Sequence, residues 1–407
     1  RFESGRPRHF FYPYILNFHF FKITSVGFFT TEISMDRPTG SLISYMSGLV
    51  KTGGGINCAQ GIPGFNPPEK LIEELKICSE LPVHQYAHGN GVIELRDIIS
   101  AETAKDIDRD NVLITNGATE AISLIYLYLR KMTGAGFTTL AFDPVYESYS
   151  NLPRIYGDRF IPFEAPAGGS FDLEDLENTV KNEHVNLIIL CSPGNPLGKI
   201  WSKEDILKLH GICSKYGTFL IFDYVYSDIY FNESPYLPYE LIDERTFFVS
   251  AFSKMLSITG WRVGYLISSK DNMQELVKIH DYTGLCAPSI LQNAICGYLR
   301  KNDMGRKYLE ELRKLVRRSF DIMHTALTGS GFKTPPIDGG YFIWTEIPPQ
   351  FDNGFDFAIE LYEKKKIGTV PGIHFSKNGN KFIRISIARN SDEISEAAKR
   401  IREFVRG

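Results

Sequence analysis

From residue 33 onward, short runs of continuous apolar residues alternate with longer segments whose apolar positions are three or four residues apart. The runs are rich in β-branched and aromatic residues, which is typical of strands buried on both faces. This alternation predicts an α/β fold with a mostly parallel sheet between helices. The expected strands are residues 111–117, 138–144, 185–193, 218–226, 245–254 and 261–267.

The C-terminal part of the chain has a different pattern. Residues 320–347 and 380–388 alternate apolar and polar positions, as in an antiparallel α+β lobe. We therefore predict a large domain over residues 66–297 and a smaller α+β domain built from residues 33–65 and 298–407. Because ligands bind at the carboxyl ends of the strands in open α/β sheets, the functional site is expected there.

Residues 1–32 form a separate segment that is crowded with Phe and Tyr, basic and nearly free of acids. This much exposed aromatic surface would be adhesive. We expect an N-terminal extension that packs on the core or on a neighbouring subunit, and the sequence assigns it no role. A transit peptide is an alternative, although the aromatic content does not suit one.

Composition narrows the class of protein. Apolar residues make up 43% of the chain and charged residues 23%, as in soluble globular proteins. A net charge of −3 gives no electrostatic reason to expect a nucleic-acid partner. No uncharged apolar run approaches the roughly 18 residues of a membrane span. The six cysteines have neither C-x-x-C nor zinc-type spacing, so we expect reduced thiols, a cytoplasmic protein and no metal.

Polar groups occur where the predicted strands end. The first strand ends at Asn116 and Gly117 and leads into a helix that begins with Ala118 and Thr119. Free backbone amides at such a turn bind phosphate. A plain strand-to-helix turn capped by threonine is the structural alternative.

Later strands end in further candidates. Asp223 lies inside an apolar run with Tyr226 three residues later, Asn195 precedes a proline, and Tyr146 follows one. A buried carboxylate needs a cationic or hydrogen-bonding partner. Taken singly, each residue also has a structural explanation, namely a cap for Asp223, a turn for Asn195 and a packed ring for Tyr146.

Residues 250–267 are mostly apolar and contain Lys254, with Arg262 eight positions later. A buried lysine is costly unless it is paired or loses its charge, although a lone lysine at a strand end is usually solvated. The candidates together provide what pyridoxal 5'-phosphate (PLP) requires. They supply a phosphate cradle, partners for the ring oxygen and ring nitrogen, and an amine for the aldehyde.

These segments resemble fold type I, class I/II PLP-dependent aminotransferases, a family that includes aspartate and kynurenine aminotransferases. The family's Schiff-base signature is resembled by SKMLSITGWRVG, and its later motifs by SPGNPLG, FDYVY and FIRISIA. Its amino-terminal elements are resembled by INCAQGIPGFNPPEKL and HQYAHGNGVIELR. The resemblance covers the chain apart from residues 1–32. It implies the type I PLP-transferase fold, a homodimer, and transfer of an amino group to a 2-oxo acid.

The resemblance also implies roles for the candidates around the cofactor ring. Lys254 would form the internal aldimine with PLP and then carry the proton between the substrate Cα and the cofactor. Asp223 would face the pyridine nitrogen. Asn195 and Tyr226 would bond the phenolic oxygen, and Tyr146 would stack on the ring.

The phosphate would be held by the amides of Ala118 and Thr119, by Arg262, and by Tyr86 from the second subunit. Substrate binding is expected from Arg384, whose planar guanidinium suits an α-carboxylate, together with Asn195 and with Gly61, where backbone approaches the substrate.

Several positions depart from the family pattern. Ala251 stands where the family usually has Ser or Gly, so a phosphate-binding hydroxyl is missing that Ser250 or Ser253 could replace. Leu197 stands where Thr is frequent, and Gly64 replaces a common acid. These departures affect the substrate assignment and leave the cofactor assignment intact.

Three other functions would use the same residues. A PLP-dependent carbon–sulfur lyase or a decarboxylase would need the same Lys254, Asp223 and Asn195, and a non-catalytic PLP-binding module would need the same cradle. No second arginine can be assigned to a distal substrate carboxylate. The amino-terminal elements favour a broad or aromatic/neutral preference, with 2-oxoglutarate or another oxo acid as acceptor.

Overall fold

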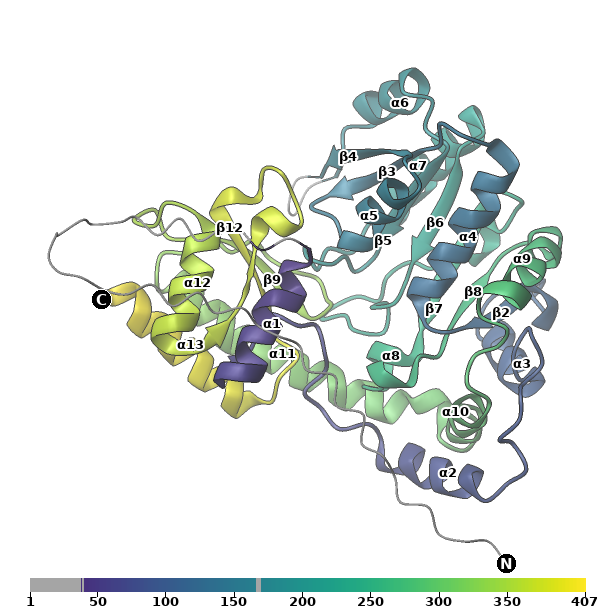
Figure 1. The fold of residues 1–407 in the computed structure, drawn as a ribbon, viewed down its shortest axis with the longest axis horizontal. Coiled ribbons are helices and arrows are strands. Elements are labelled where there is room, and N and C mark those ends of the chain that lie inside the picture. The colour runs from purple at the N-terminus through teal and green to yellow at the C-terminus, as the bar shows by residue number, and fades with distance from the viewer. Residues whose placement is uncertain (1–37, 39, 166–169) are drawn as a thin grey trace, which may run out of the picture. The chain divides into compact units, whose positions relative to one another are not determined.

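A seven-stranded sheet with the order β2-β8-β7-β6-β5-β3-β4 organises the larger part of the molecule (Figure 1). The computed structural model describes residue 38 and residues 40–165 and 170–407, so the expected extension over residues 1–32 lies outside the described residues. All neighbouring strands are parallel except β8, which runs antiparallel to β2 and β7. The strands are β2 (Val112–Thr115), β3 (Thr138–Asp143), β4 (Arg159–Glu164), β5 (Leu187–Cys191), β6 (Phe219–Asp223), β7 (Thr246–Ala251) and β8 (Gly264–Ile267).

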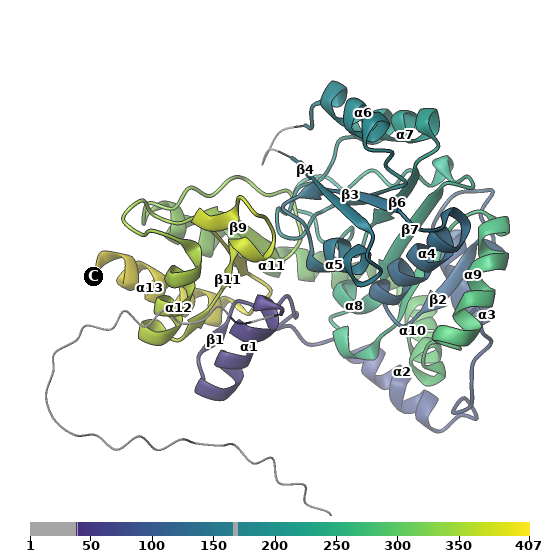
Figure 2. The ribbon, with the colours of Figure 1, turned by 45° about the horizontal axis from the view of Figure 1, so that its top comes forward.

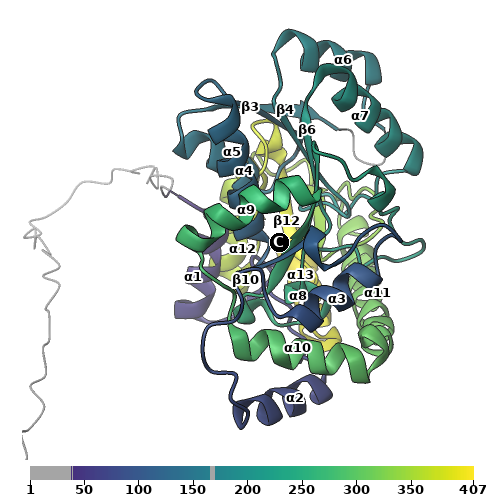
Figure 3. The same ribbon diagram turned by 90° about the vertical axis from the view of Figure 1, so that its right-hand side faces the viewer.

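The two faces of this sheet bury alternate residues of the same strands. Leu220 and Phe222 of β6 join one hydrophobic core, whereas Ile221 between them joins the other. Figure 3 shows α4, α5 and α9 on one side of the strands and α3, α6 and α7 on the other. The helices of this part are α2 (Glu69–Ser79), α3 (Ile93–Ala101), α4 (Ala118–Thr133), α5 (Glu147–Ile155), α6 (Leu173–Asn182), α7 (Lys203–Tyr216), α8 (Phe252–Met255), α9 (Lys270–Thr283) and α10 (Ser289–Lys301). The predicted sheet between helices is confirmed.

Strand β4 was absent from the sequence-based prediction. It lies at the sheet edge, and only Phe163 among its residues is buried. Because Arg159 and Pro162 interrupt its apolar residues, it lacks the continuous run by which the other strands were recognised. The predicted run 245–254 also extended too far, since the strand ends at Ala251 and Lys254 lies on the short helix α8.

A smaller lobe contains the antiparallel sheet β11-β12-β9 and the parallel pair β1-β10. Its elements surround two further hydrophobic clusters, and Figure 2 shows α1, α12 and α13 beside its strands. Segments from the beginning and the end of the described chain meet in this lobe, because Ile56 of β1 pairs with Ile367 of β10. The exact domain boundaries stay a prediction. The elements are α1 (Leu42–Gly53), β1 (Ile56–Asn57), α11 (Arg306–Thr328), β9 (Phe342–Glu346), α12 (Gly354–Lys365), β10 (Ile367–Gly368), β11 (Val370–Pro371), β12 (Phe382–Ser386) and α13 (Ser391–Arg406).

The remaining regular elements are short 3₁₀ turns, of which η3 and η5 border the site described below. They are η1 (Arg109–Asn111), η2 (Tyr239–Leu241), η3 (Thr259–Trp261), η4 (Asp303–Gly305), η5 (Gly372–His374) and η6 (Gly379–Lys381). Within the described ranges, no helix combines the length and the apolar character needed to cross a membrane.

Candidate active site

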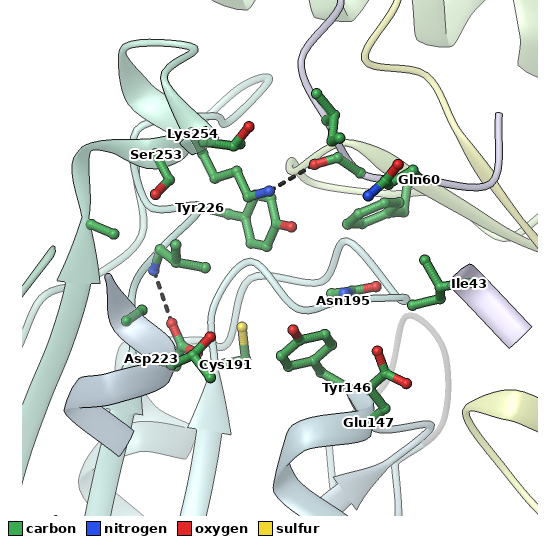
Figure 4. Close-up of a pocket in the computed structure, with 18 of the residues that line it drawn as sticks. Ile43, Gln60, Tyr146, Glu147, Cys191, Asn195, Asp223, Tyr226, Ser253 and Lys254 are labelled. Carbon is green, nitrogen blue, oxygen red and sulfur yellow. Dashed lines mark hydrogen bonds between the residues drawn. The ribbon is translucent and has the colours of Figure 1, made fainter. Parts of the chain in front are cut away.

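A cavity of about 440 Å³ opens at the carboxyl ends of β5, β6 and β7, where residues of the smaller lobe complete its wall (Figure 4). The structure brings together here all the predicted site residues except one, Tyr86. The residues that line the cavity include Gly61, Ala118, Thr119, Tyr146, Asn195, Asp223, Tyr226, Lys254, Arg262 and Arg384.

Lys254 projects from α8 into this cavity. Its Nζ donates a hydrogen bond to the carbonyl oxygen of Gly61 at 2.7 Å and lies 5.7 Å from the ring centre of Tyr226. Burial, followed by the positive charges of Arg384 and Arg262, lowers the pKa of Lys254 from 10.5 to about 8. A substantial share of this amine is therefore neutral near physiological pH, which a nucleophile or a base requires.

Asp223 is the last residue of β6 and is 3% exposed. Its carboxylate accepts hydrogen bonds from the Tyr149 hydroxyl at 2.7 Å and the Val225 N–H at 3.0 Å, and burial raises its pKa. Both donors are neutral. A cationic N–H group placed in the cavity against this carboxylate would supply the charge partner that its two donors do not.

Arg384 crosses the cavity floor between two aromatic rings, with its guanidinium carbon 4.2 Å from the centre of Phe342 and 4.7 Å from that of Phe375. Its Nη1 donates to Asn195 Oδ1 at 2.9 Å, and its Nη2 donates to the carbonyl of Ala59. Burial lowers its pKa to about 10. Because the Asn195 oxygen is engaged by Arg384, the amide NH₂ of Asn195 is available as a donor.

The turn before α4 and the turn after η3 pack closely to form an anion cradle. Arg262 donates to the carbonyls of Asn116 at 3.1 Å and Thr259 at 2.9 Å, which holds its guanidinium beside the helix start. Gly117 has φ +83°, and a Cβ there would lie 2.3 Å from Nη2 of Arg262. Glycine is required at this position, and the free amides of Ala118 and Thr119 and the guanidinium are close enough to share one anion.

The missing hydroxyl at Ala251 has a local replacement. Ser253 lines the cavity beside Ala251, whereas the Ser250 hydroxyl donates to the Tyr224 carbonyl at 3.3 Å. The structure therefore favours Ser253 over Ser250 as the additional phosphate ligand.

Gly61 and Gly64 have separate reasons for being glycine. A Cβ at Gly61 would lie 2.4 Å from Cζ of Phe342, so only glycine lets this backbone reach Lys254. A Cβ at Gly64 would lie 3.0 Å from the Ala388 carbonyl oxygen, and Gly64 does not line the cavity. Leu197 is buried against the smaller lobe's core and likewise lies outside the cavity wall.

Tyr86 lies outside the cavity and is 82% exposed. Its loop passes the end of α9, since a Cβ on Gly89 would lie 2.9 Å from Oδ1 of Asp281. Nearby on α9 and just after it, Tyr282 and Leu285 are 93% and 44% exposed. These apolar side chains form a surface suited to a partner subunit.

Tyr149 and Glu147 are among the polar residues of the cavity wall that were not predicted from the sequence. Tyr149 lies three residues after Tyr146 on α5, so helical spacing alone could have placed it on the same face. Glu147 had no comparable signal, because a glutamate in the first turn of a helix is ordinarily a surface residue.

The residues that line the cavity together fit PLP. The amine, the ring-nitrogen partner, the amide donor and the anion cradle all line one cavity, and the buried carboxylate of Asp223 calls for a cationic partner such as a protonated pyridine nitrogen. Arg384 and Asn195 leave the adjoining space polar enough for a substrate carboxylate.

Comparison with known proteins gives a consistent result. Residues 54–401 match the family model described as aminotransferase class I and II. A probable aspartate aminotransferase of Methanocaldococcus jannaschii is 31% identical over 86% of this chain and 93% of its own length. A methionine aminotransferase of Escherichia coli is 28% identical over 89% of this chain and 96% of its own.

Among solved structures, N-succinyldiaminopimelate aminotransferase from Mycobacterium tuberculosis superposes with a TM-score of 0.83. It is 26% identical and the match covers 90% of this chain and 97% of that one.

Proposed function

The chain belongs to the aminotransferase class I and II family, and on that premise we propose how its residues transfer an amino group from an amino acid to a 2-oxo acid. The family's members use PLP, so the predicted enzyme class and cofactor are confirmed. The same match supports transamination over a lyase, a decarboxylase or a non-catalytic module. The residue roles, the subunit arrangement and the substrate are proposals.

When bound, PLP supplies an electron-withdrawing ring that stabilises negative charge at the substrate Cα. We assign the phosphate to the amides of Ala118 and Thr119, with Arg262 and Ser253. We assign the ring oxygen to the Asn195 amide and the Tyr226 hydroxyl, and one ring face to Tyr146, all of which line the cavity. These contacts hold the ring in one orientation, which is the protein's main contribution before any proton moves.

Lys254 is the proton carrier in this proposal. With a pKa of about 8, the Lys254 amine is partly neutral. The neutral amine would accept a proton from the substrate Cα and carry it to the cofactor. Asp223 would hold a proton on the pyridine nitrogen of bound PLP, because a carboxylate this deeply buried is stabilised by an adjacent N–H⁺. Arg384 binds the α-carboxylate and so orients Cα.

The observation that carries this proposal is the convergence of the Lys254 amine, the Asp223 carboxylate and the Arg384 guanidinium on one cavity. The test is the visible absorption spectrum of the protein with PLP. We expect a cofactor band that disappears on addition of an amino acid alone and returns with a 2-oxo acid, and that is absent in Lys254→Ala. Release of ammonia and an oxo acid without an acceptor would indicate a lyase, and failure to take up PLP would overturn the proposal.

We also propose a homodimer in which Tyr86 reaches the phosphate of the other subunit. The support is the exposure of Tyr86 beside Tyr282 and Leu285. Mixed dimers of Tyr86→Ala and Lys254→Ala chains test it, because one site of each hybrid then has both wild-type residues. Recovery of activity on mixing is expected, and no recovery despite hybrid formation would contradict shared sites.

The six cysteines are free thiols in the described part of the chain, which supports a cytoplasmic location. For substrates, the starting proposal is a broad or aromatic/neutral amino-acid preference with 2-oxoglutarate or another oxo acid as acceptor. Cell fractionation and a substrate panel test the two points separately.

A further inference from the structure

Glu147, the first residue of α5, places a carboxylate in the cavity wall and has no role assigned in cofactor binding. Figure 4 shows it beside Tyr146 on the side where Ile43 lies, away from Asp223 and Ser253. Its side chain is 24% exposed, so it is accessible from the cavity. Because the charge of Arg384 reaches Glu147, a substrate whose α-carboxylate lies on Arg384 is within reach of this second carboxylate.

His374 holds this carboxylate from behind. Nε2 of His374 lies 3.0 Å from Oε2 of Glu147, and the histidine side chain is 7% exposed and does not line the cavity. The loop that carries His374 is itself docked, because the Val145 N–H donates to the Phe375 carbonyl at 2.9 Å. The Glu147 carboxylate is therefore fixed in position, while its partner is shielded from the substrate.

Glu147 is ionised in this setting. Burial alone would raise its pKa, but the neighbouring His374, Ser41 and Arg384 side chains together leave the pKa below its usual value. A substrate entering the cavity thus meets a carboxylate and not a carboxylic acid.

The cationic side chains lining the cavity are already assigned. They are Lys254, Arg262 for the phosphate and Arg384 for the α-carboxylate, so the described residues of this subunit offer no further cation for a second carboxylate. The acidic side chains in the wall are Asp223, which faces the cofactor, and Glu147. The side-chain end of the cavity therefore repels negative charge and accepts hydrogen-bond donors.

We propose that Glu147 is a specificity-determining residue that selects amino acids with amide, hydroxyl or cationic side chains and disfavours those with a second carboxylate. This inference rests on the proposed function and deepens it. It separates this chain from the aspartate preference named for its relative from M. jannaschii. Because donor and acceptor occupy the same cavity in turn, it also favours a neutral 2-oxo acid over 2-oxoglutarate.

Isosteric substrate pairs test the proposal. Glutamine and glutamate, and likewise asparagine and aspartate, differ in charge and hardly in shape. We expect the wild-type enzyme to favour the amide by about tenfold or more in kcat/KM, as one unscreened like charge would produce. The isosteric Glu147→Gln variant should bring both ratios close to one, and the exposed Glu174→Gln, in the first turn of α6, should leave them unchanged.

Binding of unreactive analogues gives a readout that does not depend on turnover. Succinamate and succinate form the same amide–acid pair, and calorimetry on the PLP-loaded protein measures their dissociation constants. We expect wild-type protein to bind succinamate at least about tenfold more tightly, with the difference lost in Glu147→Gln. If no amino acid reacts, the proposed function fails while the binding ratio still tests Glu147. An unchanged ratio in Glu147→Gln, or tighter succinate binding by wild type, overturns the inference.

Discussion

Replacing Tyr149 with phenylalanine isolates the contribution of one hydrogen bond to Asp223. The Tyr149 hydroxyl donates to Oδ2 of Asp223 at 2.7 Å, and the ring is 4% exposed and packs edge-on against Tyr146. Phenylalanine keeps the ring and removes the donor. Asp223 would then retain the Val225 N–H as its remaining protein donor among the described residues.

The expected magnitude follows from the burial of both partners. A hydrogen bond to a charged group contributes about 1.5–3 kcal/mol, and the burial of both partners here supports a value in that range. That energy is a factor of about 10 to 100 in an equilibrium or rate constant. Its loss raises the pKa of Asp223 further, since burial already raises it and the hydroxyl opposes that effect. Less carboxylate is then present to hold the proton on the ring nitrogen.

Two assays measure the effect, and the chain offers a matched control. We expect kcat and PLP affinity of Tyr149→Phe each to fall by about tenfold or more, by absorbance titration and steady-state kinetics. In Tyr126→Phe, the lost hydroxyl also donates to a buried carboxylate at 2.7 Å, that of Asp158, which keeps an ion pair with Arg130. This control should lose stability and keep its kcat and PLP affinity. Unchanged kcat and PLP affinity in Tyr149→Phe would refute the role assigned to this contact.

Three further changes probe the amine, the cradle and the carboxylate site. Below pH 8 the cofactor-free Lys254→Met variant should be more stable than wild type by about 2 kcal/mol, because the folded protein carries a partly buried ammonium whose pKa is lowered from 10.5 to about 8. As the pH rises from about 8 to 10.5, the free energy of unfolding of the wild type should rise relative to that of the variant. Parallel pH profiles of this free energy, measured by chemical denaturation, would contradict the prediction. Gly117→Ala should weaken binding of PLP about tenfold or more, because the added Cβ is strained at φ +83° and, lying 2.3 Å from Arg262, would displace the cradle. Binding of pyridoxal, which lacks the phosphate, should be unaffected. Arg384→Lys should raise KM for amino acids about 100-fold with a smaller change in kcat, since an ammonium cannot replace two guanidinium bonds. An equal fall in kcat and kcat/KM, with KM unchanged, would instead indicate a misplaced Asn195.

Much of the fold could be predicted because burial dictates local composition. Strands covered on both faces must be apolar throughout, so six of the seven sheet strands had a recognisable run and the half-exposed edge strand β4 did not. The antiparallel direction of β8 had no local signal, because direction depends on how the chain crosses the sheet.

The sequence by itself determined which chemical groups end the buried strands. Asp223, Asn195 and Lys254 were candidates because each is a polar residue in or beside an apolar run. Each also had a structural explanation on its own, and it was the motif pattern that joined them into one site. That inference needs only local burial and order along the chain.

Tertiary structure decided which side chains meet across long separations. Tyr149 donates to Asp223 over 74 positions, and His374 contacts Glu147 from a different lobe. The choice of Ser253 over Ser250 depends on which hydroxyl faces the cavity. That Tyr86 is exposed and outside the cavity is likewise visible only in the folded chain. Hydrogen bonds and charges act over a few ångströms, so the chain must fold before these groups can tune one another.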